Sequence, residues 1–318
     1  MNFAVTNRIP ESAVELLRGA GEVRLDQRET AIPRQDLLEL VAGADAVLTL
    51  LHDRVDAELL DAAGARLRCV ANVAVGYDNV DVAAAAERGV VVTNTPEVLD
   101  DATADMTWAL LLAATRRLAE GDRLVRSGRE WSWGMQFMLG SSLRGKLLGI
   151  VGLGGIGRRV AERGRAFGME VAYHQRHPAP AEVEAALAAE RMPLERLLAE
   201  ADVLSLHCPL TAETHHLIGS GELESMKPSA VLVNAARGPV VDERALAEAL
   251  ASGQIAAAGL DVYEHEPRVE PGLLELDNVV LAPHLGSATV ETRTAMAELA
   301  ARNAIAVTRG EAPLTPVR

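Results

Sequence analysis

KLLGIVGLGGIGRRV, residues 146–160, is the most informative segment of this 318-residue chain. Its apolar run, 147–151, predicts a buried parallel strand that leads directly into the pattern G-x-G-x-x-G. After the glycines, apolar and small residues recur at helical spacing as far as Gly168. The glycine pattern alone is weak evidence, but a strand before it and a helix after it together predict a dinucleotide-binding unit.

Each glycine of this pattern has its own physical task. Gly152 permits the tight turn, Gly154 lets the backbone approach a pyrophosphate, and Gly157 lets the helix pack closely on the strand. The N–H groups at the start of the helix, together with the helix dipole, favour the charges of the two phosphates.

Composition limits the class of protein. The chain is long enough for about two domains, 49% of its residues are hydrophobic and its formal net charge is -14. This charge argues against nucleic acid or an anionic membrane as a partner, and no apolar run is long enough to cross a bilayer. Cys69 and Cys208 are too few for a disulfide framework, and we find no signal peptide, so we expect a cytoplasmic protein.

Short apolar runs alternate with helical patterns over residues 2–93 and again over residues 147–281. This alternation predicts an α/β fold with two doubly wound parallel sheets of the Rossmann or flavodoxin type. A last helix is expected over 290–307, and Pro313 and Pro316 indicate a loose tail.

Polar side chains follow several of these apolar runs, and parallel sheets bind ligands at the carboxyl ends of their strands. Arg237 can present a planar fork to a carboxylate. His284, if paired with Glu264 or Glu266, can act as a proton donor, because a carboxylate stabilises the imidazolium. Each of these residues also has a plain structural explanation, as a solvated charge or part of a loop, and spacing does not select between the two glutamates.

A further strand end lies at residues 71–81. The N–H groups of Val75 and Gly76 could hold a carboxylate there. The alternative is a helix-capping turn in which Asp78 or Asp81 is the cap.

Residues 101–116 predict a helix that is apolar nearly all round, which suggests burial between domains or subunits. The segment that follows, 121–143, contains two of the three tryptophans and has no clear period. We expect it to form an interface.

Taken together, these motifs resemble the D-isomer-specific 2-hydroxyacid dehydrogenase family over essentially the whole chain, closest to its glyoxylate/hydroxypyruvate reductases. The resemblance rests on the glycine loop and six other motifs, which are Val75-Gly76-Tyr77-Asp78, Thr103-Ala104-Asp105, His207-Cys208-Pro209-Leu210-Thr211, Asn234-Ala235-Ala236-Arg237-Gly238, Gly259-Leu260-Asp261-Val262 and Pro283-His284-Leu285-Gly286-Ser287.

The resemblance implies roles for particular residues. It implies a catalytic set of Arg237, Glu266 and His284, and so selects Glu266 of the two glutamates. The substrate contacts implied are Val75, Gly76, Arg237, Ser287 and Trp133, the tryptophan coming from the neighbouring subunit of a homodimer. The cofactor contacts implied are Thr103, Gly152, Gly154, Gly155, Ile156, Gly157, Gln175, Arg176, His177, Pro209, Ala235, Asp261 and Gly286.

The resemblance also implies a discontinuous layout with a cleft between two domains. Residues 1–98 and 286–318 would form the substrate domain, and residues 99–285 the dinucleotide-binding domain. The expected activity is reduction of small 2-oxo acids with NAD(P)H, with His284 as proton donor. Phosphoglycerate, formate and phosphite dehydrogenases, and a nucleotide-sensing corepressor-like protein, remain alternatives on the same scaffold.

Two positions depart from the family pattern. NAD-binding members commonly carry an acidic residue after the second strand to hold the ribose 2′-OH. Here the sequence from Tyr173 to Pro178 has no carboxylate but contains Arg176, so we expect NADPH to be preferred over NADH. Ala74 stands where many relatives have a hydroxyl residue. We expect no metal, because neither His215-His216 nor the pair His174 and His177 has a third ligand at useful spacing.

Overall fold

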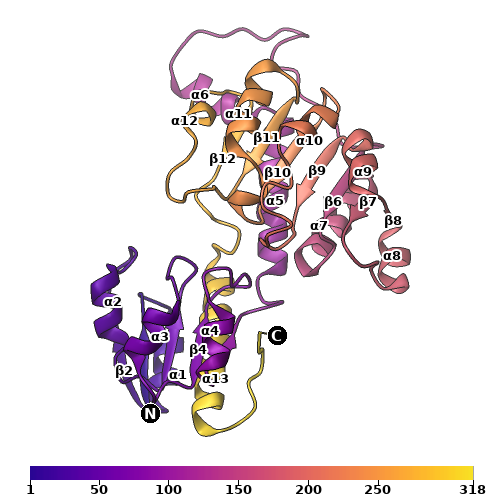
Figure 1. Cartoon of the computed structure of the whole chain (residues 1–318). Helices are drawn as coiled ribbons and strands as arrows, with labels where there is room; N and C mark the ends of the chain where they lie inside the picture. Colours follow the sequence, from indigo (N-terminus) through magenta and orange to yellow (C-terminus); the bar gives the residue numbers. More distant parts are fainter. Residues whose placement is uncertain (318) are drawn as a thin grey trace. The chain divides into compact units, whose positions relative to one another are not determined.

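The computed structural model describes residues 1–317, and in it the chain leaves its first unit after Leu99 and returns to it at Ala288 (Figure 1). The first unit therefore comprises Met1–Leu99 and the residues from Ala288 onward, and the second unit is Asp100–Ser287. The boundaries expected from the sequence lie after residue 98 and before residue 286.

The sheet of the first unit has five parallel strands in the order β2-β1-β3-β4-β5. This is the flavodoxin-like order. The strands are β1 (Asn2–Val5), β2 (Glu22–Leu25), β3 (Ala46–Thr49), β4 (Cys69–Asn72) and β5 (Val91–Thr93).

Five helices belong to the first unit, namely α1 (Glu11–Arg18), α2 (Arg34–Val41), α3 (Ala57–Ala63), α4 (Val82–Glu87) and α13 (Val290–Arg309). Asp56 and Asp81 begin α3 and α4, because their carboxylates accept the N–H groups of Leu59 and Ala84. Helix α13 packs on α1 and on strands β3 and β4. This late helix therefore completes the core that residues 1–99 begin.

The sheet of the second unit has seven parallel strands in the order β12-β11-β10-β9-β6-β7-β8. The order is that of a Rossmann sheet with one added strand, and the switch point lies between β6 and β9. The strands are β6 (Leu147–Val151), β7 (Glu170–His174), β8 (Ala189–Arg191), β9 (Val203–Leu206), β10 (Val231–Asn234), β11 (Ala257–Leu260) and β12 (Val279–Leu281). The predicted α/β class with two parallel sheets is confirmed.

The helices of the second unit are α5 (Asp100–Thr115), α6 (Leu118–Arg126), α7 (Gly155–Ala166), α8 (Ala181–Leu187), α9 (Leu194–Glu200), α10 (Ser220–Ser225), the 3₁₀ helix η1 (Gly238–Val240), α11 (Glu243–Ser252) and α12 (Pro271–Leu274). Helix α5 packs on α7 and on strands β10 and β11. Much of the apolar surface of α5 is therefore buried inside the second unit. The sequence had suggested burial between domains or subunits. The segment from residue 121, predicted to have no regular structure, begins inside helix α6.

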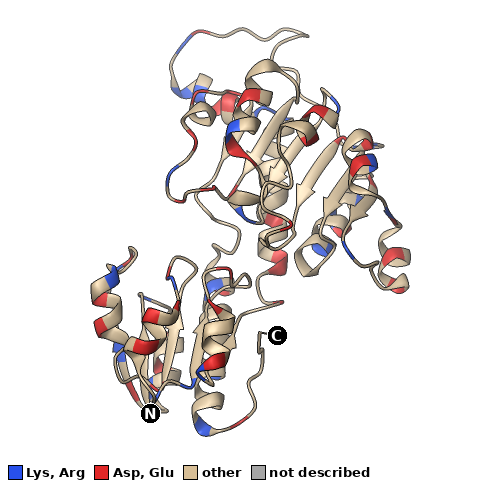
Figure 2. Ribbon diagram, in the orientation of Figure 1, with Lys and Arg blue, Asp and Glu red and all other residues tan. Residues whose placement is uncertain are grey.

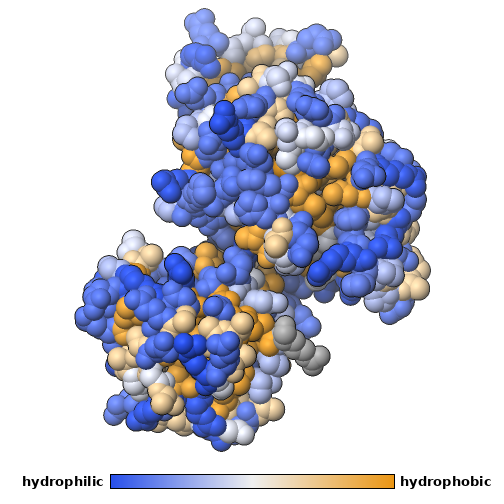
Figure 3. All heavy atoms as spheres, viewed as in Figure 1, coloured by the Kyte–Doolittle hydropathy of each residue, from blue (hydrophilic) through white to orange (hydrophobic). Residues whose placement is uncertain are grey.

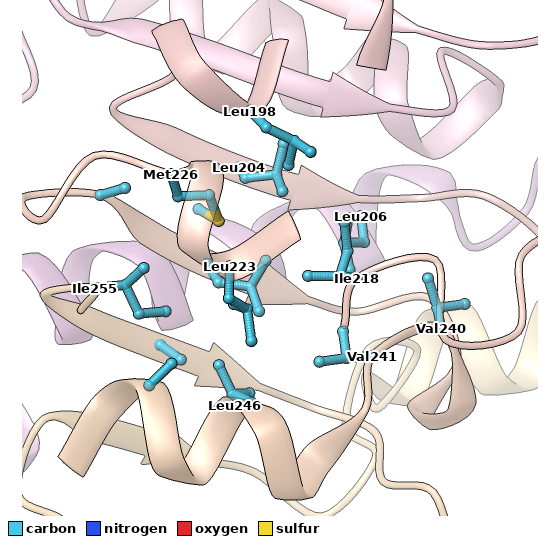
Figure 4. Close-up of a cluster of buried hydrophobic side chains, with 14 of the residues drawn as sticks. Leu198, Leu204, Leu206, Ile218, Leu223, Met226, Val240, Val241, Leu246 and Ile255 are labelled. Atoms are coloured by element: carbon cyan, nitrogen blue, oxygen red, sulfur yellow. The ribbon is translucent and has the colours of Figure 1, made fainter. Parts of the chain in front are cut away.

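Two clusters of buried apolar side chains cover the two faces of this sheet. Figure 4 shows one of them, in which Leu204 and Leu206 of β9 face Leu223 of α10 and Leu246 of α11. Charged residues lie mainly on helices and loops, while strands β6 and β9 carry none (Figure 2). On the face that Figure 3 shows, each unit is mostly hydrophilic with hydrophobic areas between. Throughout the described chain, the helices are too short or too polar to span a bilayer.

Candidate active site

The glycine loop connects β6 to α7, as the sequence predicts. Gly152 has a φ of 95°, and a Cβ there would lie 2.8 Å from the backbone of His207. A Cβ on Gly157 would lie 2.2 Å from the carbonyl oxygen of Gly152. Any side chain at these two positions would therefore push the turn away from the sheet or from the helix.

Gly154 has a different environment, because a Cβ there would meet nothing within 4 Å. The protein itself does not require glycine at this position, so the small residue is explained by an outside group that approaches the backbone. The first N–H groups of α7 have no acceptor within the helix and lie at the positive end of its dipole. Gly155 and Ile156 supply two of them, and this donor set fits a pyrophosphate.

The turn after β7 carries Gln175, Arg176 and His177. The Oε1 atom of Gln175 accepts the Leu153 N–H at 2.9 Å, so Gln175 braces the glycine loop. Arg176 and His177 are exposed. Arg191, at the end of β8, donates to the carbonyl oxygens of Gln175 and Arg176 at 3.0 and 2.9 Å. A role for Arg191 cannot be predicted from the sequence, because β8 has only three residues and no apolar pattern.

The sequence also does not reveal that this turn has an acidic neighbour, Glu213. A hydrogen bond from Thr211 and the charge of Arg176 both lower the pKa of Glu213. Arg176 therefore lies near a carboxylate from another segment, although none is present between residues 173 and 178.

Asp261 follows β11 and is buried. Its two oxygens accept the N–H groups of Leu285 and Gly286 at 2.6 and 2.7 Å. Burial raises the pKa of Asp261 in spite of these hydrogen bonds. A Cβ on Gly286 would lie 3.2 Å from both Asp261 and Thr103, which brings three of the expected cofactor residues together.

The remaining residues expected near the cofactor or substrate follow the strands of the same sheet. Pro209 comes after β9 and Ala235 after β10, while Ser287 is the last residue of the second unit. They lie at the carboxyl ends of the strands, where doubly wound sheets bind ligands.

His284 and Glu266 form the pair that the family resemblance implies. Nδ1 of His284 lies 2.9 Å from Oε2 of Glu266, and Oε1 of Glu266 accepts the Tyr263 N–H at 3.0 Å. Burial alone would raise the pKa of Glu266, but the hydrogen bond and charge of His284, the Tyr263 N–H and the charge of Arg237 outweigh it and lower the pKa. His284 has a φ of 54°, an uncommon backbone conformation for a residue with a side chain, of the kind found at functional sites.

Arg237 is brought near this pair by close backbone packing. A Cβ on Gly238 would lie 1.8 Å from the carbonyl carbon of Tyr263, so only glycine lets the two loops touch. The Arg237 guanidinium is near enough for its charge to act on Glu266, and its Nη1 donates to the Ala236 carbonyl at 2.9 Å. The second unit thus gathers a planar cation, a carboxylate and an imidazole.

The second glutamate has a histidine partner of its own. Nε2 of His216 lies 2.5 Å from Oε1 of Glu264, and the rings of His215 and His216 are 4.1 Å apart. These three residues place possible ligand atoms within 4.8 Å of one another, so the expectation that His215-His216 lacks a third ligand is wrong. Folding supplies Glu264 from a distant loop, although the direct His216–Glu264 contact accounts for the grouping without an ion.

The turn after β4, in the first unit, presents N–H groups and conceals carbonyls. The carbonyl oxygens of Ala74, Val75 and Gly76 accept hydrogen bonds from Thr95 N, Asn94 Nδ2 and Asn72 Nδ2 at 2.9, 2.8 and 2.9 Å. Neither Val75 N nor Gly76 N has an acceptor in the described part of the chain. Asp81, at the end of this segment, caps α4, so the capping alternative is correct for Asp81, and the same segment presents the Val75 and Gly76 N–H groups.

Trp133 lies in the second unit, in the irregular segment after α6, with 76% of its surface exposed. Trp131 of the same segment stacks on Phe137, their ring centroids 6.0 Å apart. Met135 and Leu139 are also exposed, so this segment carries a group of uncovered apolar side chains.

A sequence model of the D-isomer specific 2-hydroxyacid dehydrogenase NAD-binding domain matches residues 108–286. The chain belongs to this family. Among its relatives, glyoxylate reductase of Thermococcus onnurineus is 52% identical, with 98% of this chain and 94% of that protein covered. Glyoxylate reductase of Pyrococcus furiosus is 51% identical over the same shares.

Solved structures of the family superpose well on this 2-hydroxyacid dehydrogenase. A protein from Thermus thermophilus matches with a TM-score of 0.93 at 46% identity, with 100% of both chains covered. An NADPH-dependent glyoxylate/hydroxypyruvate reductase of Sinorhizobium meliloti, in complex with NADP and malonate, matches with a TM-score of 0.86 at 38% identity, covering 99% of this chain and 96% of that one. The chain is therefore an oxidoreductase with a nicotinamide cofactor.

Proposed function

We propose that this dehydrogenase reduces small 2-oxo acids of the glyoxylate and hydroxypyruvate type to D-2-hydroxy acids with NAD(P)H. The observation that carries the proposal is the His284–Glu266 contact of 2.9 Å with Arg237 beside it. The substrates named for the relatives at about half identity support the same chemistry.

The role of each residue follows from its charge and from the protons that it can donate or accept. Glu266 accepts from Nδ1 of His284, so Nε2 remains to donate a proton to the carbonyl oxygen of the substrate. Arg237 holds the carbonyl and carboxylate oxygens and stabilises the developing alkoxide. The N–H groups of Val75 and Gly76 bind the substrate carboxylate, and Ser287 contributes to substrate binding. The nicotinamide cofactor, when bound, supplies the hydride.

The glycine loop and helix α7 would hold the pyrophosphate, and Thr103, Pro209, Ala235, Asp261 and Gly286 the nicotinamide end. We propose NADPH as the preferred form, because Arg176 is exposed at the turn after β7 and no acidic residue is present from 173 to 178. The named cofactor dependence of the Sinorhizobium relative supports this preference.

We assign the first unit the role of substrate domain, in which Val75 and Gly76 hold the carboxylate. We assign dinucleotide binding to the second unit, which also supplies Arg237, His284 and Ser287 to the substrate. The exposed segment with Trp133 is assigned to contact with a second copy of the chain. Two free cysteines and no disulfide in the described chain agree with a reducing cytoplasm.

A panel of 2-oxo acids with NADPH and NADH, followed by the absorbance of the reduced cofactor, tests the proposal. The panel should include glyoxylate and hydroxypyruvate, and a separate oxidative arm should supply NADP⁺ or NAD⁺ to 3-phosphoglycerate, formate and phosphite. The highest kcat/KM with glyoxylate or hydroxypyruvate is expected. A higher value in the oxidative arm, or binding of cofactor without turnover of any substrate, would overturn it.

A further inference from the structure

The end of the chain is anchored beside the proposed carboxylate-binding turn, although its prolines suggest a loose tail. Val317 N donates to the Val92 carbonyl at 2.9 Å, and Pro316 forms an antiparallel bridge with Thr93. Strand β5 is at the edge of its sheet. Residues 315–317 therefore cover an open strand edge.

A chain of hydrogen bonds connects this segment to helix α13. The side chain of Asn303 is fully buried, and its Oδ1 accepts the N–H groups of Leu314 and Thr315 at 2.9 and 3.1 Å. Its Nδ2 donates to Oγ1 of Thr315 at 2.9 Å. Asn303 thus holds the backbone and the hydroxyl of Thr315 in one orientation.

Thr315 in turn orients Asn94 through two hydrogen bonds. The Thr315 hydroxyl donates to the Asn94 carbonyl at 2.6 Å, and Asn94 N donates to the Thr315 carbonyl at 3.2 Å. The Asn94 side chain then donates from Nδ2 to the Val75 carbonyl at 2.8 Å. Four residues therefore form a continuous path, Asn303 to Thr315 to Asn94 to Val75, within the first unit.

We propose that Asn94 and Thr315 are positioning residues for the Val75 and Gly76 N–H groups. The peptide plane between Val75 and Gly76 is rigid, so a bond that fixes the Val75 carbonyl also fixes the opposite-facing Gly76 N–H. The Ala74 carbonyl, which accepts the N–H of Thr95 directly after Asn94, fixes the Val75 N–H in the same way. The C-terminal segment thereby holds the donors ready before a carboxylate arrives, which lowers the cost of binding. This inference rests on the proposed role of the turn in substrate binding.

The test uses the full-length enzyme with Thr315→Val, which removes the hydroxyl while keeping the shape, and with Asn94→Ala. One hydrogen bond contributes about 0.5–1.5 kcal/mol, so each variant should raise KM for glyoxylate about 3- to 10-fold. KM for the cofactor should stay unchanged. Thr315→Ser, which retains the hydroxyl, should restore KM, and Leu314→Ala, at an exposed neighbouring position, is the matched control.

The second measurement is hydrogen exchange of the Val75 and Gly76 amides, with and without oxalate as a carboxylate probe. Oxalate should slow exchange in the wild type and do so less in Thr315→Val at equal concentration. An unchanged KM with unchanged protection in both variants would overturn the inference. Equal losses for substrate and cofactor would also overturn it, because they indicate general destabilisation. If the wild type reduces no 2-oxo acid, the proposed function fails, and the exchange rates still decide whether Thr315 orders these amides.

Discussion

Glu266 binds one nitrogen of the His284 ring, because Nδ1 of His284 lies 2.9 Å from Oε2 of Glu266. The other nitrogen, Nε2, is left to donate a proton. The carboxylate is itself held by the Tyr263 N–H at 3.0 Å. The imidazole is therefore oriented by a group that is already fixed. A neighbouring glutamate, Glu264, has the same chemistry but is engaged with His216, 2.5 Å away.

His284→Ala should lower kcat for glyoxylate reduction roughly 10²- to 10⁴-fold, the usual contribution of a positioned acid. Initial rates at saturating cofactor measure this effect. His265→Ala, in the loop that carries Glu266, is the control and should retain activity. A His284 variant within a few-fold of the wild type would remove this residue from the proton transfer.

Glu266→Gln should move the alkaline limb of the pH–rate profile to lower pH, because a neutral amide no longer stabilises the imidazolium. The lowered pKa of Glu266 keeps its carboxylate ionised at neutral pH, so the charge is present throughout the profile. Its contribution to stability is present above its ordinary pKa and is lost only as the pH falls through the lowered value. Glu264→Gln is the matched control. Superimposable profiles for wild type and Glu266→Gln would disprove the pairing.

Arg237→Lys should raise KM for the 2-oxo acid and lower kcat, since an ammonium cannot reproduce the two parallel hydrogen bonds of a guanidinium. Steady-state kinetics at several substrate concentrations separate the two effects. Arg244→Lys, on the exposed side of α11, controls for the change of cation. Near-normal kcat/KM in Arg237→Lys would place this residue outside the site.

The sequence predicts best what depends on neighbouring residues. The β6–α7 turn could be identified because a strand, three glycines and a helix follow one another, and Gly152 and Gly157 are indeed required by close packing. Strand β8 was missed because Ala189–Arg191 has no apolar pattern, and Arg191 was missed with it.

Contacts between segments that are distant in the sequence could not be predicted either. Neither the Glu264–His216 pair nor the Asn94–Thr315 contact can be read from spacing, since their partners are separated by 48 and 221 residues. For the same reason, spacing could not choose between Glu264 and Glu266, and only the family pattern did so.

Trp133→Ala should impair kcat/KM for the 2-oxo acid more than binding of the cofactor, if this exposed side chain reaches the site of a second copy. Sedimentation velocity at assay concentration, together with kinetics, measures assembly and activity on the same sample. Met135→Ala, at a position equally exposed, is the control. A fully active monomer would refute a role in trans.

Arg176→Ala should weaken NADPH selectively and leave NADH nearly unchanged. Charge-assisted hydrogen bonds to a phosphate are worth about 1.5–3 kcal/mol each, so a loss of roughly ten- to a hundredfold in kcat/KM with NADPH is expected. Arg196→Ala, whose side chain pairs with Glu200 on α9, controls for the loss of one positive charge. Equal losses with both cofactors would mean that the guanidinium does not read the 2′-phosphate.

The discontinuous first unit imposes an order on synthesis. Its sheet is made early, but helix α13, which packs on α1, β3 and β4, is translated only after the whole of Asp100–Ser287. The second unit has all its strands in one continuous segment and can fold while translation continues. Until α13 is synthesised, the first unit has an uncovered apolar face. Folding on the ribosome should therefore begin with the second unit and end when α13 packs on the first unit.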